Sequence, residues 1–258
     1  MTTTTRSRSS APNTPKAALR RDLRLAKELT PRVAEQFHVE RRRIAKHPAT
    51  AADQLNVVEW EAVLADIQIR VGRAVFEPEY VKLTGRPIPT DTRAKQELVA
   101  LIARLIRDGR EAETIAAYIE EAAAGIVTTT RKRIATILRR VSRPSDTRKL
   151  SRALRRLYMT DFVKKRANRI ALDQVLRATA VYEHGAAMLA QETTGREYIQ
   201  VWRNQGDDRV RATHSNVSPV SLGEMFKVGG SLLRFPRDPA GPAHETYGCR
   251  CWTERRRL

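Results

Sequence analysis

Four side chains near the C-terminus have the types that bind zinc. Cys249 and Cys251 stand one residue apart, and His214 and His244 precede them. Two histidines and two cysteines are the ligand types and the number of a closed tetrahedral zinc site. The Cys-x-Cys spacing is tighter than the usual spacing, however, and the histidines lie far apart, so two interpretations stay open. Either zinc binds some of these four residues, or the cysteines are small buried hydrophobes and the histidines hydrogen-bond the loops.

The same region also contains residue types that catalyse reactions. Asp207, His214 and His244 could form a metal-dependent nuclease site, with Asp208 as the alternative carboxylate, and Cys249 beside His244 could act as a thiol nucleophile. Such sites need a third group that orients the base, and none stands at a recognisable spacing. The sequence therefore favours a protein that is not an enzyme, with no catalytic residues and no required cofactor.

Simple structural roles are available for the charged residues of this region. The segment Asp207–Arg211 has two carboxylates followed by two guanidiniums, which favours ion pairs that pin a turn against a neighbouring hairpin. Cys249 and Cys251 are too close in sequence for an unstrained disulfide. We expect two free thiols, which suits a reducing compartment better than a secreted disulfide scaffold.

Positive charge is the strongest compositional signal. The 258 residues include 48 Lys and Arg against 29 Asp and Glu, a formal net charge of +19. The excess is local: residues 126–180 carry 16 basic and 3 acidic side chains, whereas residues 51–125 carry 9 basic and 13 acidic ones. Such a stretch predicts a surface that attracts DNA phosphates or an acidic protein. A well-solvated basic surface with no partner is the simpler alternative.

The side chains expected to form this surface lie on three helical stretches. They are Arg131, Lys132, Arg133, Arg139, Arg140, Arg152, Arg155, Arg156, Lys164, Lys165, Arg166 and Arg169.

Helical periodicity dominates the first 196 residues, and aromatic residues make up only 5% of the chain. Apolar positions repeat at helical spacing in residues 15–46 and 53–76, and again in 90–108 after a cap at Thr90 or Asp91. Prolines and glycine indicate a connection over 77–89. Gly125 is expected to separate a helix near 115–125 from one over 128–141, which Arg143-Pro144 ends. Residues 146–192 are expected to form two or more helices that end at Gly195.

The pattern changes after Gly195. Residues 197–202 alternate as a strand does, and 225–235 indicate a hairpin around Gly229-Gly230. We predict a mainly α protein with a small C-terminal α+β module. Its expected parts are a disordered basic tail (1–15), a helical region (16–145), basic helices (146–196) and the loop-rich module (197–258).

Several ordered motifs in the second half resemble a known family. These are the runs 166–185 (RANRIALDQVLRATAVYEHG) and 201–214 (VWRNQGDDRVRATH), then Phe235-Pro236 and 248–251 (GCRC). Together they resemble the phage head-morphogenesis family, which includes the Mu protein F-like and SPP1 gp7-like minor head proteins. The resemblance covers roughly residues 160–252. The positions that match the family pattern are Gly185, Trp202, Asp207 or Asp208, Arg209, Arg211, His214, Pro236, Cys249, Arg250 and Cys251.

The resemblance implies a minor virion protein that is packaged inside the capsid. Its implied partner is the portal protein, with packaged DNA and the scaffold or major capsid protein as further candidates, and its implied place is the capsid interior after assembly in the host cytoplasm. The alternatives are a stand-alone, non-specific DNA-binding protein and the nuclease considered above. The N-terminus lacks the apolar stretch of a secretory signal, and no segment is apolar enough to suggest a membrane partner.

Overall fold

The computed structural model describes residues 15–88, 110–141 and 146–258. Three expectations lie outside these residues: the disordered tail over 1–14, the helix beginning near Thr90 or Asp91, and the break at Arg143-Pro144. Within the described residues the chain is mostly helical and ends in a small module of short antiparallel strands, which confirms the predicted fold class.

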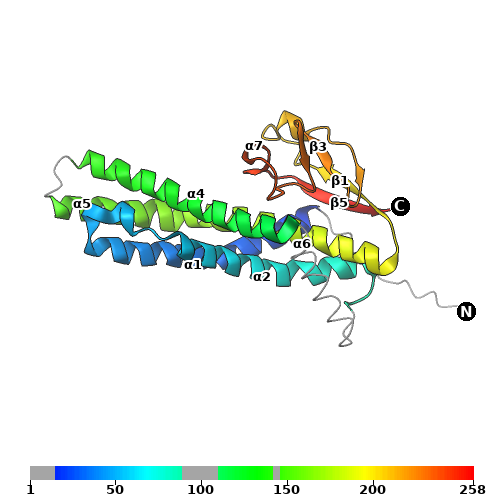
Figure 1. Ribbon diagram of the computed structural model, residues 1–258, viewed down its shortest axis with the longest axis horizontal. Helices are drawn as coiled ribbons and strands as arrows, with labels where there is room; N and C mark the ends of the chain where they lie inside the picture. Colours follow the sequence, from blue (N-terminus) through cyan, green and yellow to red (C-terminus); the bar gives the residue numbers. More distant parts are fainter. Residues whose placement is uncertain (1–14, 89–109, 142–145) are drawn as a thin grey trace, which may run out of the picture.

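The helical body is an elongated bundle of antiparallel rods, with the C-terminal module lying across one end (Figure 1). The segments α5, η2 and α6 follow one another without a non-helical residue between them, because the residues at both junctions keep right-handed helical angles. The elements of the body are α1 (Pro15–Lys46), η1 (Pro48–Gln54), α2 (Val57–Thr84), α4 (Arg110–Arg140), α5 (Thr147–Arg156), the π-helical η2 (Leu157–Arg166) and α6 (Ala167–Thr194).

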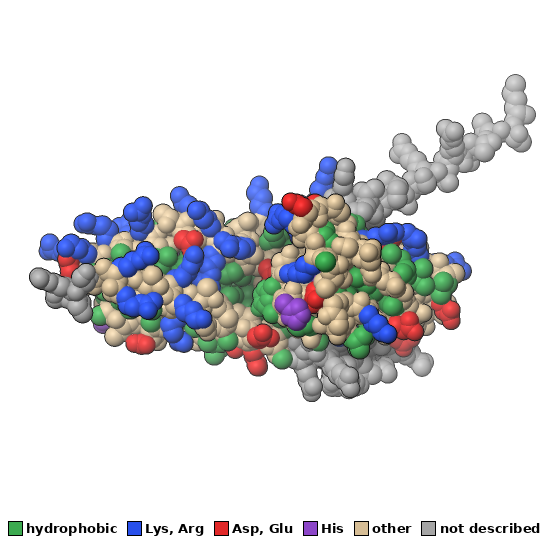
Figure 2. Space-filling model, turned by 90° about the horizontal axis from the view of Figure 1, so that it is seen from above, with side chains coloured by type: hydrophobic (Ala, Val, Ile, Leu, Met, Phe, Trp, Pro, Cys, Tyr) green, Lys and Arg blue, Asp and Glu red, His purple; other side chains and the backbone are tan. Residues whose placement is uncertain are grey.

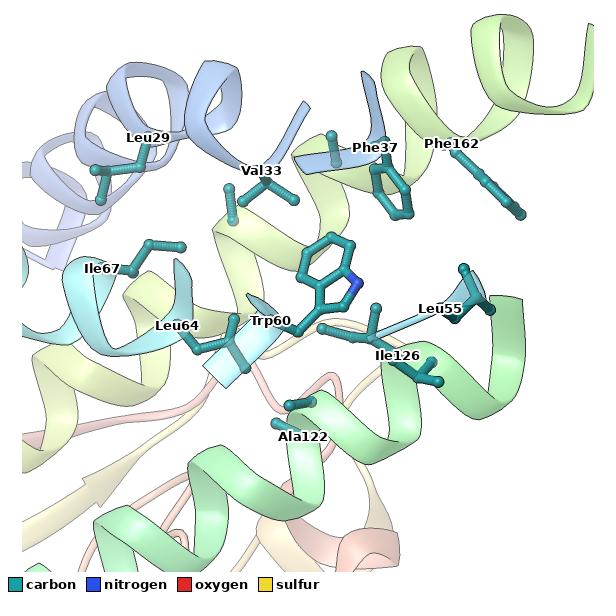
Figure 3. Packing of buried hydrophobic residues seen from close by; sticks show 14 of the residues in the cluster. Leu29, Val33, Phe37, Leu55, Trp60, Leu64, Ile67, Ala122, Ile126 and Phe162 are labelled. Atoms are coloured by element: carbon teal, nitrogen blue, oxygen red, sulfur yellow. The ribbon is translucent and has the colours of Figure 1, made fainter. Parts of the chain in front are cut away.

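One hydrophobic cluster joins all these helices. Figure 3 shows Phe37 of α1, Trp60 of α2, Ile126 of α4 and Phe162 of η2 converging on the same interior. The ring centroids of Phe37 and Trp60 are 4.8 Å apart in an edge-to-face arrangement, and those of Phe37 and Phe162 are 5.2 Å apart. Burying one such side chain stabilises the fold by roughly 1.5–3 kcal/mol. The helices before and after residue 145 therefore share a single core.

Two helices run through residues that were expected to end them. Gly125 lies within α4, so the prediction of separate helices on either side of it is wrong. Its backbone is not in the left-handed region, and burial of the next two residues, Ile126 and Val127, holds α4 to the core. Likewise, α2 continues past Pro78 to Thr84, because Val75 and Tyr80 are buried on either side of the proline. The connection begins instead at Gly85 (φ +72°).

The C-terminal module contains two small sheets. Its elements are β1 (Tyr198–Arg203), η3 (Ala212–His214), β2 (Val220–Ser221), β3 (Phe226–Val228), β4 (Ser231–Leu233), α7 (Ala243–Thr246) and β5 (Trp252–Arg257). The strand at 197–202 and the hairpin around Gly229-Gly230 are confirmed, with both glycines at positive φ. Strands β2 and β5 flank β1 antiparallel, and β5 pairs along its whole length from Tyr198↔Arg257 to Arg203↔Trp252. The sequence had not indicated β5.

Buried arginines attach the module to the bundle. Arg237 has a positive φ of 66° and donates from Nη1 to the backbone oxygen of Leu176 on α6 (3.1 Å). Arg177 of α6 lies with its guanidinium carbon 4.4 Å from the ring centroid of Tyr247 in the module. These contacts hold the segments before and after α7 against α6. The residues able to bind a metal lie in the same part of the module.

Candidate metal centre and cationic surface

Three of the four predicted zinc ligands meet in the module. The Nδ1 atom of His214 lies 3.6 Å from the Sγ atom of Cys249 and 3.5 Å from the Sγ atom of Cys251. All three side chains are buried, and their ligand atoms lie within 4.8 Å of one another. Both thiols are free of disulfide bonds, as the sequence predicted.

Local backbone geometry explains why both cysteines face the same histidine. Residues two apart on an extended chain point to the same side, so the Cys-x-Cys spacing presents both sulfur atoms together. Gly248 precedes the pair with φ +64°, which turns the chain after α7 toward η3. The backbone N–H of Cys251 also approaches the Sγ atom of Cys249 at 3.5 Å. Arg250, the residue between them, points outward.

These distances fit a metal ion bound by nitrogen and sulfur. With Zn–S near 2.3 Å and Zn–N near 2.0 Å, the nitrogen-to-sulfur edge of a tetrahedron is about 3.5 Å. The two observed distances, 3.5 and 3.6 Å, match that edge. A cavity of about 10 Å³, close to the space of one water molecule, is lined by all three side chains. The described residues thus form a possible metal-binding site.

A buried carboxylate supports the histidine from the other side. Glu245 of α7 lies with Oε2 2.8 Å from Nε2 of His214, and the same oxygen accepts a hydrogen bond from the Thr213 hydroxyl at 2.9 Å. Metal-bound histidines commonly donate their second ring nitrogen to such a carboxylate, which fixes the tautomer and leaves the other nitrogen for the metal. The Trp202 ring packs edge-to-face on His214, with centroids 5.2 Å apart.

The electrostatics favour one thiolate beside the histidine. The pKa of Cys249 is lowered to about 4 by its hydrogen bond with Cys251, by His214 and by the positive charge of Arg237, although burial opposes the shift. The pKa of Cys251 is raised in turn, because the Cys249 thiolate takes its hydrogen bond and because it is buried. Burial lowers the pKa of His214, but Cys249 and Glu245 outweigh it and raise the pKa overall. A thiolate is the form of cysteine that binds metals.

His244 does not belong to this cluster, so the candidate ligands that meet are His214, Cys249 and Cys251. Its side chain is 72% exposed, and its Nε2 atom lies 3.9 Å from Oε1 of Glu245. Adjacent residues of a helix face different directions, and α7 turns Glu245 inward and His244 outward. Sequence reasoning missed Glu245, because nothing in the local pattern distinguishes it from a surface glutamate.

The nuclease and thiol-nucleophile arrangements are not assembled. The carboxylate of Asp207 accepts two hydrogen bonds from Arg250, at 2.7 and 2.5 Å, and His244 faces solvent. Within residues 15–88, 110–141 and 146–258, the three-residue group of His214 and the two cysteines is the one candidate metal cluster. An ion pair does hold the turn, but it joins Asp207 to Arg250 in the loop after α7 and not to the hairpin around Gly229-Gly230.

The remaining motif residues lie in the module, apart from Gly185 on α6. Arg211 donates to the backbone oxygen of Tyr247 at 2.5 Å, which ties η3 to the loop after α7. Pro236 lies beside the buried Arg237 in the strap that follows β4, and Asp208 is exposed. Gly185 lies on α6 where a β-carbon would be 3.5 Å from the ring of Phe76, which is ordinary contact.

Eleven of the twelve predicted basic side chains are exposed on α4, α5, η2 and the start of α6. We call this set the distal cationic surface, since most of it lies over the end of the bundle away from the module, where Figure 2 shows Lys and Arg side chains gathered. Arg133 and Arg169 lie nearer the module. Its members are Arg131, Lys132, Arg133, Arg139, Arg140, Arg152, Arg155, Arg156, Lys164, Lys165 and Arg169.

Arg166 is the exception among the basic side chains. It is half-buried, donates to Thr130 Oγ1 at 2.5 Å and to the backbone oxygen of Ile126 at 2.9 Å, and lies over the Phe162 ring. Burial and the nearby Arg133 lower its pKa to about 10. Arg166 therefore joins η2 to α4 and lies mostly below the surface.

No protein-family model, curated protein or solved structure matches the chain. None of the described helices is long and apolar enough to cross a membrane.

Proposed function

We propose that this chain is a minor head protein of a tailed bacteriophage that acts inside the capsid by binding an acidic partner. The distal cationic surface carries the proposal. Eleven exposed basic side chains lie on α4, α5, η2 and the start of α6, and within the described residues Asp161 is the acid that pairs with one of them, Arg133. Such a surface attracts polyanions because bound Lys and Arg release condensed counterions.

The C-terminal module supports the proposal that the chain is a minor head protein. The residues that resemble the head-morphogenesis signature contact one another in one small structure, through the Trp202–His214 ring contact and the Asp207–Arg250 ion pair. They would serve as a non-enzymatic structural unit, while the bundle binds the portal protein, the packaged DNA or both. The scaffold and the major capsid protein are further acidic-partner candidates during assembly in the host cytoplasm.

Co-purification with the portal protein of the same phage tests the proposal. We expect a complex that forms on co-expression, survives nuclease treatment and weakens in high salt. A complex that nuclease dissolves would instead support a non-specific DNA-binding protein that uses the same surface. Absence of both portal and DNA binding would contradict the proposed function.

We further propose that the metal of the candidate centre is zinc, held by His214, Cys249 and Cys251. Sulfur and imidazole ligands suit zinc, and zinc bound this way contributes folding free energy to a small module. Glu245 would hold His214 in the metal-binding tautomer.

Metal analysis of the purified protein tests the zinc proposal. We expect about one zinc per chain in the wild type and a near-complete loss in Cys251→Ser. His244→Ala is the matched control and should keep its zinc, because its side chain faces solvent. Equal zinc content in wild type and Cys251→Ser would overturn the proposal.

A further inference from the structure

A groove lies between the bundle and the module, on the side of α4 and α6. Its volume is about 770 Å³, and its module wall is the loop Tyr247–Arg250 that carries the metal ligand Cys249. Figure 2 shows hydrophobic side chains in the hollow between the basic end of the bundle and the module. The small and apolar residues that line the groove are Ala122, Gly125, Ile126, Ile170, Leu172 and Leu176.

Arginines surround this apolar floor. Arg133, Arg166 and Arg169 line it from the helices, and Arg209 and Arg250 line it from the module. Asp173 is the one acidic lining residue among the described residues, and it already pairs with Arg177 at 3.0 Å. Asp173 therefore does not neutralise these five arginines, and the rim of the groove is positive.

Two of the five arginines have uncommitted donors. Arg133 pairs with Asp161, Arg250 pairs with Asp207, and Arg166 is bound within the bundle. The exposed guanidiniums of Arg169 and Arg209 form no hydrogen bond or ion pair within the part of the chain that the structure describes. The charge of Asp207 interacts with Arg209, but its carboxylate already binds Arg250. Each free guanidinium offers five N–H donors in a fork that matches a carboxylate.

The apolar residues at the base of the groove and the arginines around it together indicate which kind of ligand it binds. A volume near 770 Å³ falls in the range of binding pockets and accommodates a few apolar side chains. Duplex DNA has a charged backbone and carries no apolar side chains that could pack against the apolar residues of the groove. Single strands bind by stacking on aromatic rings, but the one aromatic lining residue, Tyr247, already has Arg177 over its ring at 4.4 Å.

We propose that this groove binds an acidic amphipathic segment of a protein partner, with apolar side chains on the floor and carboxylates on Arg169 and Arg209. The inference rests on the proposed function, because it names the chemistry of the acidic partner. The segment belongs to another protein: residues 1–14 contain no Asp or Glu, and residues 89–109 carry four basic and three acidic side chains. An amphipathic helix lying in a groove is a common mode of recognition.

Fluorescence anisotropy with defined probes tests the groove. The first probe is a peptide of about 15 residues with Leu at helical spacing and Glu between, and the second replaces each Leu by Ser at equal charge. Arg169→Glu/Arg209→Glu alters the groove. Arg152→Glu/Arg155→Glu makes the same charge change on exposed arginines of α5, and thermal melts verify that both variants fold.

We expect the leucine peptide to bind at least about tenfold more tightly than the serine peptide in about 0.15 M salt. The groove variant should weaken that binding at least about tenfold and the α5 variant less than about twofold. Equal losses in both variants, equal binding of both peptides, or no binding would overturn the inference. Displacement of the peptide by an oligothymidine with the same dependence on Arg169 and Arg209 would assign the groove to nucleic acid and also overturn it.

The outcomes separate this inference from the proposed function. Suppose that portal or DNA binding requires Arg152 and Arg155, but that peptide binding is unchanged in the groove variant. This result would support the proposed function and contradict the inference about the groove. Loss of every interaction removes both.

Discussion

Single side chains in the bundle interior show how burial changes their chemistry. Glu40 of α1 is fully buried, and it accepts hydrogen bonds from the indole N–H of Trp60 at 2.8 Å and the hydroxyl of Tyr158 at 3.3 Å. Burial raises its pKa to about 7, although both hydrogen bonds act in the opposite direction. The hydrogen bonds of Glu40 link α1 to α2 and η2. Above its pKa the buried carboxylate is ionised, which lowers the free energy of unfolding.

Glu40→Gln is expected to stabilise the protein at alkaline pH. Between about pH 4.5 and 7 the folded state keeps the Glu40 proton while the unfolded state loses it, so stability falls as pH rises through this window. Glutamine removes that fall and keeps an acceptor for Trp60. Urea unfolding should give a gain of about 1–3 kcal/mol at pH 8 and almost none at pH 4.

A glutamate on the same helix provides the control for this substitution. Glu28 is exposed, and Glu28→Gln should show no such difference between the two pH values. An equal gain at pH 4 and pH 8 in Glu40→Gln would show that the ionised carboxylate is not what costs stability.

Elements depend on their glycines in different ways, and the β3–β4 turn gives one example. A β-carbon on Gly229 would come 2.1 Å from Oε1 of Glu245, whereas one on Gly230 would meet nothing within 4 Å. Both glycines have positive φ, so both substitutions carry the same kind of backbone cost, about 1–2 kcal/mol. Only Gly229 lets the hairpin approach the carboxylate that supports His214.

Gly229→Ala should therefore weaken metal binding while Gly230→Ala should not. Displacing Glu245 removes the partner of the His214 ring, which in metal sites costs about 10–100-fold in affinity. Competition with a chromogenic zinc chelator measures the affinity of each variant. Similar zinc affinities in the two variants would separate the hairpin from the metal centre.

The long helices show a second contrast between glycines. On α2, a β-carbon at Gly72 would lie 2.6 Å from the ring of Tyr182 on α6, but one at Gly125 on α4 would meet nothing within 4 Å. Gly72→Ala should destabilise the bundle by about 1–3 kcal/mol because the helices must move apart. Gly125→Ala should stabilise it by about 0.5–1 kcal/mol through helix propensity. Chemical unfolding of both variants measures the signs, and a stabilising Gly72→Ala would contradict the close approach of α2 and α6.

At the scale of the whole molecule, charge and shape are divided between two ends. Figure 1 shows α5 at the end of the bundle away from the module, and Figure 2 shows Lys and Arg side chains gathered over that end. Buried arginines connect the bundle to the module, through Arg177 on Tyr247 and Arg237 on Leu176. A partner bound to the basic side chains of α5 would therefore not touch the candidate metal centre, whereas a segment in the groove would lie beside Cys249.

Neutralising two arginines of the distal cationic surface should change how DNA binding depends on salt. If Arg152 and Arg155 contact phosphates, Arg152→Gln/Arg155→Gln should reduce the slope of log affinity against log salt by about two. The control, Lys227→Gln/Arg257→Gln, removes the same charge from exposed residues of the module. Identical slopes in both variants would show that DNA responds to net charge alone and not to this surface.

Local information in the sequence predicts much of this architecture. The helical periodicity of α1 and α2, the strand β1, the β3–β4 turn and the end of α6 at Gly195 all depend on residues a few positions apart. Helix ends were wrongly predicted at Gly125 and near Pro78, because both residue types weaken helices locally. Burial of their neighbours against other helices offset that cost, and only the packed structure reveals such burial.

The sequence by itself determined the fold class, the local concentration of positive charge and the residue types able to bind a metal. Only the tertiary structure decided which of those residues meet. His214 and Cys249 are 35 positions apart, Glu245 replaces His244 at the histidine, and Arg250 takes the carboxylate of Asp207. β5 pairs along its length with β1, a strand far from it in the sequence. Backbone preferences act over a few residues, whereas a site or a sheet edge depends on which distant segments pack together.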